Sequence, residues 1–427
     1  MSKDERIPEG RLARLGALAA LGARAGAGLL VKGGAESTAE RTAEVLGRMR
    51  GLAAKAGQIA SYVDGVVPEQ NREVFERALA TLRDQAMRSS FADVKKTVER
   101  ELGAPLGELF TDFDEAPLAS ASIGQVHRAR LGDGRDVAVK VQHAGIERAV
   151  ESDLASAAVL EPIANLAGGR KLNSKQVFAE MSSRLREELD YALEAERQER
   201  FRALHDQDPM IHVPAVVRDR SSRRVLTTEL ARGVSLDEVA TRAEPERRAF
   251  AETLWRFVFK GNLVGGMFNA DPHPGNYLFD RDGRVSFLDF GCVEPLGEER
   301  RVAATGLHLA AIERDEDRFA AFAKRILHLR GGTWEKMAVA YSRRCFEPLF
   351  GAPFRITREY AASLVHELRD MGKSVRKLPK GEFVPLPKGM VFMNRLQFGF
   401  YSVLARLDVA VDYARVERSF MSEAGLI

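Results

Sequence analysis

The sequence predicts an α+β protein of two lobes, preceded by a helical extension at its N-terminus. The chain has 427 residues, of which 45% are hydrophobic, so it can bury more than one core. Two strand–turn–strand patterns occur, one around Gly132-Asp133-Gly134 and one around Asp280-Arg281-Asp282-Gly283. Most of the remaining chain shows apolar residues at helical spacing. Strands confined to a few places among many helices favour an α+β fold.

Three segments follow from these patterns. Residues 1–112 carry helix-period apolar residues and are expected to form the extension. Residues 113–228 hold the first hairpin and a further strand from Val225 to Leu230, so we expect a small, strand-rich lobe with helices at about 147–168 and 174–204. Residues 229–427 are expected to form a large helical lobe.

The most informative motif lies in the large lobe. The stretch 269–276 reads Asn-Ala-Asp-Pro-His-Pro-Gly-Asn, and Asp289-Phe290-Gly291 follows the second hairpin. An aspartate, an asparagine five positions later and then Asp-Phe-Gly is the order found in protein kinases. Asp271 would lie beside the attacking hydroxyl or water, and Asn276 and Asp289 would bind Mg²⁺ through oxygen atoms. Each motif alone is more often a simple turn, but their order and spacing predict a kinase-like site.

An upstream half of such a site is also present. Lys140 lies within the strand pattern Asp136–Gln142, which matches the kinase Val-Ala-Ile-Lys motif. A lysine on an isolated strand usually reaches solvent, and a charged helix is usually a solvated face. Position in the ordered series instead predicts that Lys140 pairs with an acidic residue of the helix at 174–204, namely Glu188, Asp190 or Glu194.

The remaining nucleotide contacts are predicted from small residues and from the hinge. A loop of small residues precedes the first hairpin and would approach phosphates with its backbone N–H groups: Ala119, Ser120, Ala121, Ser122, Ile123, Gly124 and Gln125. An ordinary turn is the alternative for this loop. The backbone of Glu229, Leu230 and Ala231, after the third strand, would meet adenine.

Together these motifs resemble the UbiB/AarF family of atypical kinases, and the likeness covers about residues 10–407. Five features carry it: Lys55-Ala56-Gly57-Gln58, the small-residue loop ending in Ser122–His127, Lys140, Glu188-Leu189-Asp190-Tyr191 with Glu194-Ala195, and Ala270–Asn276 with Asp289-Phe290-Gly291. The resemblance implies a bilobal protein-kinase-like fold with an N-terminal extension over the active site.

The resemblance also implies a role for each matching residue. Lys140 would pair with Glu194 and orient the α- and β-phosphates of ATP or ADP. Lys55 would reach into the active site and meet Glu188, and Gln58 would lie over the nucleotide. Members of this family resemble poor protein kinases and are associated with ATP hydrolysis and with isoprenoid quinone lipids.

Some positions depart from the family pattern. Asn269 replaces the usual histidine before the catalytic aspartate, and Ala270 stands where ordinary kinases have arginine. Without that arginine, a phosphorylated activation loop has no anchor. Serine replaces alanine at Ser120 and Ser122, which leaves nucleotide selectivity open.

Composition limits the partners. A net charge of only +3 gives no indication of nucleic-acid binding, and two cysteines are too few for a disulfide framework or a zinc site. The segment from Arg11 to Lys32 fits either a basic amphipathic helix on an anionic membrane surface or an ordinary N-terminal helix. Because no apolar run reaches about 18 residues, we expect a cytoplasmic protein that is at most peripheral on a membrane.

We therefore expect a Mg²⁺-dependent atypical kinase or ATPase of lipid or quinone metabolism. A nucleotide-binding pseudokinase that performs no chemistry is one alternative. A small-molecule phosphotransferase is another, although Lys55–Gln58 and the small-residue loop count against it. The phosphoryl acceptor, the lipid and the oligomeric state stay open.

Overall fold

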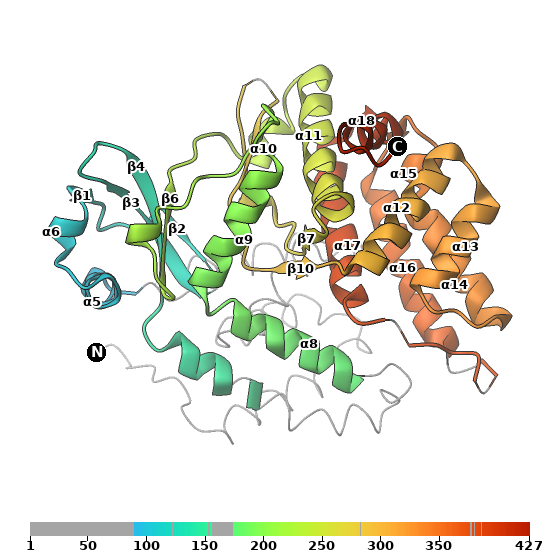
Figure 1. The fold of residues 1–427 in the computed structure, drawn as a ribbon, viewed down its shortest axis with the longest axis horizontal. Coiled ribbons are helices and arrows are strands. Elements are labelled where there is room, and N and C mark those ends of the chain that lie inside the picture. The colour runs from blue at the N-terminus through green and yellow to red at the C-terminus, as the bar shows by residue number, and fades with distance from the viewer. Residues whose placement is uncertain are drawn as a thin grey trace, which may run out of the picture.

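The computed structural model describes residues 89–121, 123–152, 154–155, 174–281, 283–375, 378–379, 381–385 and 387–427. Several predictions from the sequence fall outside these residues: the helical extension over residues 1–88, most of the helix at about 147–168, the roles of Lys55, Gln58 and Ser122, and the membrane-binding alternative for the segment from Arg11 to Lys32. Within the described part, a small sheet-containing lobe and a large helical lobe lie side by side (Figure 1). The predicted α+β class is therefore confirmed.

The small lobe is built on one antiparallel sheet. Its strands are β1 (Asp112–Phe113), β2 (Ala119–Ser120), β3 (Gly124–Arg130), β4 (Asp136–Gln142) and β6 (Val225–Glu229). They run in the order β1-β3-β4-β6, and β2 pairs with β3. The predicted first hairpin is thus confirmed, with Val126 opposite Lys140. Because side chains alternate along β4, Val137, Val139 and Val141 are buried and Lys140 faces the other side of the sheet.

Two N-terminal helices pack against this sheet, α5 (Phe91–Leu102) and α6 (Leu106–Leu109). Val94 and Val98 of α5 share a buried cluster with the valines of β4. Ser90 caps α5 by accepting a hydrogen bond from the backbone N–H of Asp93. These helices therefore complete the small-lobe core, and the domain boundary at residue 112 stays a prediction.

The helix expected over 174–204 is in fact two helices, α8 (Ser174–Glu187) and α9 (Tyr191–Leu204). Asp190 causes the break, because its Oδ1 accepts hydrogen bonds from the backbone N–H groups of Ala192 and Leu193, at 3.0 and 3.2 Å. Aspartate is a strong N-cap residue, so a new helix begins there. The expectation of one continuous helix was wrong, because the spacing of charges does not reveal an N-cap within the segment.

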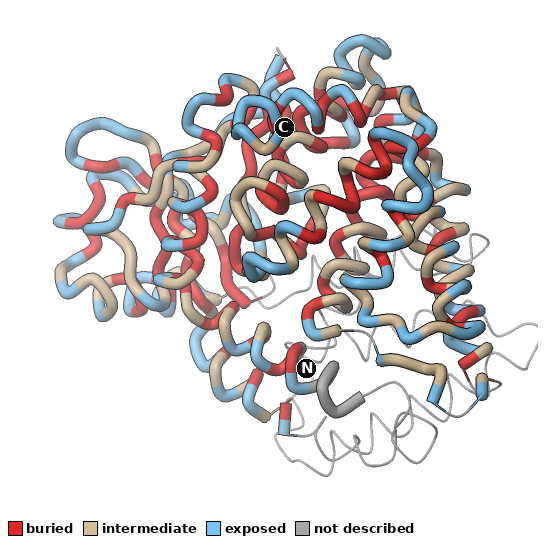
Figure 2. The backbone as a smooth tube through the Cα atoms, turned by 45° about the vertical axis from the view of Figure 1, so that its right-hand side comes forward, coloured by how far each residue is buried: buried red, intermediate tan, exposed pale blue. Residues whose placement is uncertain are grey.

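The large lobe is mainly helical. Its long helices are α11 (Glu244–Leu263), α12 (Glu298–Glu313), α13 (Glu316–Ile326), α14 (Gly332–Cys345), α16 (Arg358–Ser374), α17 (Met390–Leu407) and α18 (Tyr413–Glu423). Its short helices are α10 (Leu236–Val239), α15 (Glu347–Phe350) and the 3₁₀ turn η4 (Pro274–Asn276), while the 3₁₀ turn η3 (Arg218–Arg220) lies against β6 in the small lobe. One extensive apolar core runs through the helices of this lobe. Figure 2 shows the many buried stretches of backbone in the protein.

Short strands between the lobes hold the predicted catalytic segments. β8 (Tyr277–Phe279) and β9 (Val285–Phe287) form the predicted second hairpin, which is confirmed, and β5 (Ile211–His212) pairs with β9. β7 (Met267–Asn269) pairs with β10 (Val293–Pro295). The 269–276 and 289–291 segments are therefore held together by backbone pairing on both sides. A further pair, β11 (Phe354–Arg355) with β12 (Ala410–Val411), lies within the large lobe against α15 and α11. Across the described ranges, every helix is too short or too polar to cross a lipid bilayer.

Candidate active site

A buried cluster of charges joins the two lobes at Lys140. Its Nζ lies 2.8 and 3.0 Å from the two carboxylate oxygens of Glu194 on α9, and 3.4 Å from Oδ2 of Asp289. The side chain of Glu194 is 3% exposed, against 30% for Asp289. Of the three acidic candidates predicted for Lys140, the structure thus brings Glu194 to it, together with Asp289 from the large lobe.

The pKa values show how tightly the cluster is coupled. Burial alone would lower the pKa of Lys140, but the carboxylates of Asp289 and Glu194 outweigh burial and hold that pKa well above its ordinary value. Burial raises the pKa of Glu194, the Lys140 ammonium opposes this effect, and Asp289 adds to it. Lys140 therefore keeps its positive charge at neutral pH, and this charge would attract the phosphate groups of a bound nucleotide.

Close packing fixes the position of Lys140. Its Nζ lies 4.9 Å from the ring centroid of Tyr191, a cation–π contact. Tyr191 in turn lies against Gly124, where an added Cβ would be 2.7 Å from the tyrosine oxygen and 2.4 Å from the Val141 carbonyl oxygen. Only glycine fits at position 124, at the end of the predicted phosphate loop.

Helix α9 also holds the Asp-Phe-Gly turn. Arg197 Nη1 donates to the carbonyl oxygen of Gly291 at 3.0 Å. Phe290 is fully buried, with its ring centroid 5.2 Å from that of Phe201 on α9. Oδ1 of Asp289 accepts a hydrogen bond from the backbone N–H of Gly291 at 2.9 Å, which orients the carboxylate. The Asp-Phe-Gly turn is therefore tied to α9 at two points, and a hydrogen bond within the turn orients Asp289.

The 269–276 segment is an ordered loop stabilised by its own side chains. Asn269 donates through Nδ2 to the carbonyl oxygen of Asp289 and accepts through Oδ1 from the backbone N–H of Asp271. Asn276 Nδ2 donates to the carbonyl oxygen of Asp271 at 3.1 Å. His273 accepts from the backbone N–H of Gly275 and so caps η4. Asn269, which departs from the family pattern, thus connects the loop to the Asp-Phe-Gly turn.

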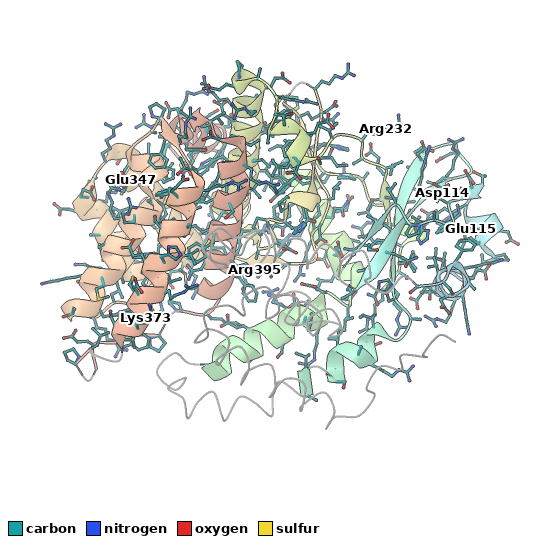
Figure 3. All side chains as sticks on the ribbon, turned by 180° about the vertical axis from the view of Figure 1, so that it is seen from behind. Asp114, Glu115, Arg232, Glu347, Lys373 and Arg395 are labelled. Carbon is teal, nitrogen blue, oxygen red and sulfur yellow. The ribbon has the colours of Figure 1, made fainter. Side chains whose placement is uncertain are left out.

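Arg395 on α17 is a residue of the site that the sequence did not indicate. Its Nη2 lies 2.7 Å from Oδ1 of Asp271, and both side chains are almost buried, at 13% and 10% exposed. Figure 3 shows Arg395 on the side of the large lobe that faces the small lobe. Arg395 is 124 residues from Asp271 in the chain, and no motif marks it.

Backbone hydrogen bonds, more than side-chain contacts, shape the predicted phosphate loop. Ala119 and Ser120 pair with β3 as the exposed strand β2, and the backbone N–H of Ala121 donates to the carbonyl oxygen of Gly124 at 2.8 Å. The side chains of Ile123 and Gln125 are buried, and Gln125 is hydrogen-bonded to His127. Glu229 ends β6 at the lobe junction, and Leu230 and Ala231 follow it. Contacts of these residues with a nucleotide stay predictions.

The two acidic residues of the Glu188-Leu189-Asp190 motif lie in different surroundings. Glu188 is 8% exposed and lies between α8 and α9, and Asp190 caps α9. Since Lys55 lies outside the described residues, its pairing with Glu188 stays a prediction. Asp190 acts on the site through the helix that carries Glu194.

The donor atoms suit a magnesium–nucleotide complex better than a protein-only metal site. Among the described residues, no group of three or more histidines, cysteines, aspartates or glutamates gathers to hold a metal ion. Mg²⁺ is usually bound by one or two carboxylates together with phosphates and water. Asp289, with Asn276 from the adjoining loop, offers oxygens of this kind.

A strand lysine paired with a helix glutamate, an Asp–Asn loop and an Asp-Phe-Gly turn between two lobes define a protein-kinase-like protein. The comparisons agree, since residues 81–323 match the model of the ABC1 atypical kinase-like domain. The chain belongs to this family.

Two curated relatives and one solved structure illustrate the likeness. The chain is 29% identical to atypical kinase COQ8B of Rattus norvegicus, over 96% of this chain and 80% of the relative. It is 27% identical to atypical kinase COQ8 of Saccharomyces cerevisiae, over 97% and 85% of the two chains, and both relatives are named as mitochondrial. The structure of Rv3197 from Mycobacterium tuberculosis in complex with erythromycin matches with a TM-score of 0.59, at 27% identity, over 88% of this chain and 94% of that one.

Proposed function

We propose that the protein binds Mg-ATP or Mg-ADP between its lobes and acts as an atypical kinase or ATPase. The observation that carries this proposal is the Lys140–Glu194–Asp289 cluster, which brings residues from both lobes together at one point. Lys140 would contact the α- and β-phosphates, and Asn276 and Asp289 would hold Mg²⁺. Asp271 would accept the proton of the attacking hydroxyl or water.

Membership of the ABC1 family supports the second part of the proposal, a role in isoprenoid quinone or related lipid metabolism. This part rests on the resemblance to UbiB/AarF proteins and not on site geometry. Quinone profiling of a strain whose own copy carries Asp289→Asn tests it directly. An unchanged quinone pool would refute the lipid assignment while leaving nucleotide binding intact.

Thermal unfolding with nucleotide tests the first part. Saturating Mg-ADP at about 100 times its Kd should stabilise the protein by about 2.7 kcal/mol through mass action. Asp289→Asn should remove most of this stabilisation because the metal loses its only charged ligand in the predicted set. Asp219→Asn is the matched control, since its carboxylate is 75% exposed and pairs with Arg220 outside the site. Equal stabilisation of all three proteins would refute the proposal.

A second candidate, a nucleotide-binding pseudokinase, is favoured by the contact between Arg395 and Asp271. The ion pair with Arg395 can hold the carboxylate of Asp271, the predicted general base, in position for catalysis. It can equally keep that carboxylate from accepting a proton. Phosphate release with and without anionic liposomes separates the two functions. Steady release that is lost in Asp271→Asn supports the enzyme, and nucleotide binding without release under either condition supports the pseudokinase.

A further inference from the structure

Helix α8 contacts the segment that follows the Asp-Phe-Gly turn. Its Arg184 donates through Nη1 to the carbonyl oxygen of Val293 at 3.1 Å and pairs through Nη2 with the carboxylate of Glu294. Val293 and Glu294 belong to β10, and α8 lies below this strand in Figure 1. The side chains of Arg184 and Glu294 are only 15% and 14% exposed, so dissolved salt screens the pair weakly. Arg184 therefore attaches α8 to both the backbone and a side chain of β10.

A second arginine extends this contact to α9. Glu187 of α8 accepts a hydrogen bond from Arg184 Nη1 at 2.5 Å and also pairs with Arg197 of α9. Arg197 Nη1 in turn donates to the carbonyl oxygen of Gly291 at 3.0 Å. Cations and carboxylates thus alternate from α9 through α8 to Glu294. Both ends of this series hold the few residues that follow the Asp-Phe-Gly turn.

The position of β10 affects the two carboxylates proposed for proton transfer and Mg²⁺ binding. β10 pairs with β7, which ends at Asn269, and the backbone N–H of Ala270 donates to the carbonyl oxygen of Cys292 at 2.7 Å. The side chain of Asn269 donates to the carbonyl oxygen of Asp289 and accepts from the backbone N–H of Asp271. A displacement of β10 would therefore shift both aspartates.

Arg184 also contacts the helix that reaches Asp271 from the other side. Its guanidinium lies 5.6 Å from the ring centroid of Phe392, a buried residue near the start of α17. Three residues later in the same helix, Arg395 pairs with Asp271. Arg184 thus connects to Asp271 by two routes, through β10 and through α17.

A charge pair at this place has a known effect in other kinases. There, a phosphorylated residue after the Asp-Phe-Gly turn pairs with an arginine, and the pair orders the segment. In this chain Glu294 carries a negative charge without modification. Its arginine comes from α8, whereas Ala270 stands where ordinary kinases have the arginine of the catalytic loop.

We propose that Arg184 is a positioning residue of the active site. By pairing with Glu294 it holds Asp271 and Asp289 in their catalytic arrangement, so the site is ordered without phosphorylation. This role rests on the proposed kinase or ATPase function. A pair that only stabilised the fold would change the melting temperature but not the rate of phosphate release by folded protein.

Hydrogen–deuterium exchange of the full-length protein tests the ordering of β10. Arg184→Gln should lower the protection of amides at 267–271 and 291–296 by about tenfold or more, because a hydrogen bond to a charged group corresponds to a factor of this size. Arg186→Gln is the matched control on the same helix, since Arg186 is 54% exposed and pairs with Glu151 away from β10. Unchanged protection in Arg184→Gln, or an equal loss in Arg186→Gln, would overturn the proposal.

Phosphate release from Mg-ATP, measured where every variant is folded, tests the effect on chemistry. Arg184→Gln should lower kcat by about tenfold or more while KM changes less than about threefold, because an arginine that positions the reacting groups acts mainly on the chemical step. Glu294→Gln should cause the same loss, and the double variant should lose no more, since the two residues act as one pair. Arg184→Lys keeps the charge and should recover part of kcat.

Three results would contradict the positioning role. These are a wild-type kcat in Arg184→Gln, additive losses in the double variant, and no recovery in Arg184→Lys. If Arg184→Gln does not fold, Glu294→Gln decides, because it removes the charge and keeps the shape of the side chain.

Failure of the proposed function gives a different result. If the wild-type protein releases no phosphate, the enzyme assignment fails, and the exchange measurement alone decides whether Arg184 orders β10. If release occurs and Arg184→Gln leaves it unchanged, the enzyme assignment stands and the positioning role is wrong.

Discussion

Replacing Lys140 with methionine should destabilise the junction between the lobes, and the effect should depend on pH. The substitution keeps most of the side-chain volume but removes the cation from Glu194, which is 3% exposed. Removing one partner of a buried ion pair costs about 3–5 kcal/mol. Because Asp289 is 30% exposed and can regain water, we expect the lower end, about 3 kcal/mol.

The sign of the pH dependence follows from Glu194. Burial already raises the pKa of this carboxyl above 4.5, and loss of Lys140 raises it further. Between the pKa of the unfolded chain and that of the folded state, the folded protein binds more protons, so its stability falls as pH increases. The loss of folding stability in Lys140→Met should therefore be largest at pH 8 and smaller near pH 5.

Hydrogen–deuterium exchange measures the loss of stability in Lys140→Met at the amides of α9 alone. Both tryptophans, Trp255 and Trp334, lie in the large lobe, so fluorescence would not report on α9. A loss of about 3 kcal/mol corresponds to a drop of roughly 100-fold in the protection factors of α9 amides at pH 8. The double variant Lys140→Met/Glu194→Gln should recover most of this protection, because it no longer buries an unpaired charge.

A matched substitution controls for the loss of a lysine. Lys324 pairs with Glu335 on the surface, with its side chain 47% exposed, and exposed pairs contribute only about 0–1 kcal/mol. Lys324→Met should therefore leave protection of α9 unchanged. If Lys140→Met lowers protection less than fivefold at pH 8, or equally at both pH values, the cluster does not couple the lobes as described.

Three further predictions concern residues around the cluster. Arg395→Gln should leave the nucleotide-induced melting shift unchanged but lower phosphate release at least tenfold, because Asp271 loses the cation 2.7 Å away that positions it. Gly124→Ala should cost about 1–3 kcal/mol, measured by urea unfolding, because its Cβ would lie 2.4 Å from the Val141 carbonyl oxygen. Asp190→Ala should lower protection in the first turn of α9 by about 1 kcal/mol, the usual value of an N-cap.

Each of these variants has a matched comparison. Arg395→Lys keeps the charge and should restore part of the release, so equal release from both variants and wild type would contradict a positioning role. Gly132→Ala is the control for Gly124, since nothing lies within 4 Å of an added Cβ there. Asp412 caps α18 in the same way, and Asp412→Ala should reduce protection in α18 while leaving α9 unchanged.

Local patterns predicted much of the structure. Alternating valines and a Gly-Asp-Gly turn predicted β3 and β4, and their register follows from the short turn. The 269–276 and 289–291 segments were found by spacing alone, because a hairpin of short strands fixes their separation. The break between α8 and α9 was missed, although the capping aspartate at position 190 is a local signal that could have revealed it.

The sequence by itself determined the fold class, the family and the residues of both halves of the candidate site, because each of these depends on short segments whose spacing sets their geometry. Charge and helix position left Glu188, Asp190 and Glu194 equivalent as partners of Lys140; the family resemblance indicated Glu194, and the packing of α9 in the tertiary structure brings that residue to the lysine. The same holds for the contact of Arg395 with Asp271, which joins a helix and a loop 124 residues apart in the chain. Such contacts depend on how side chains from distant segments fill space together, and this is not encoded in any one segment.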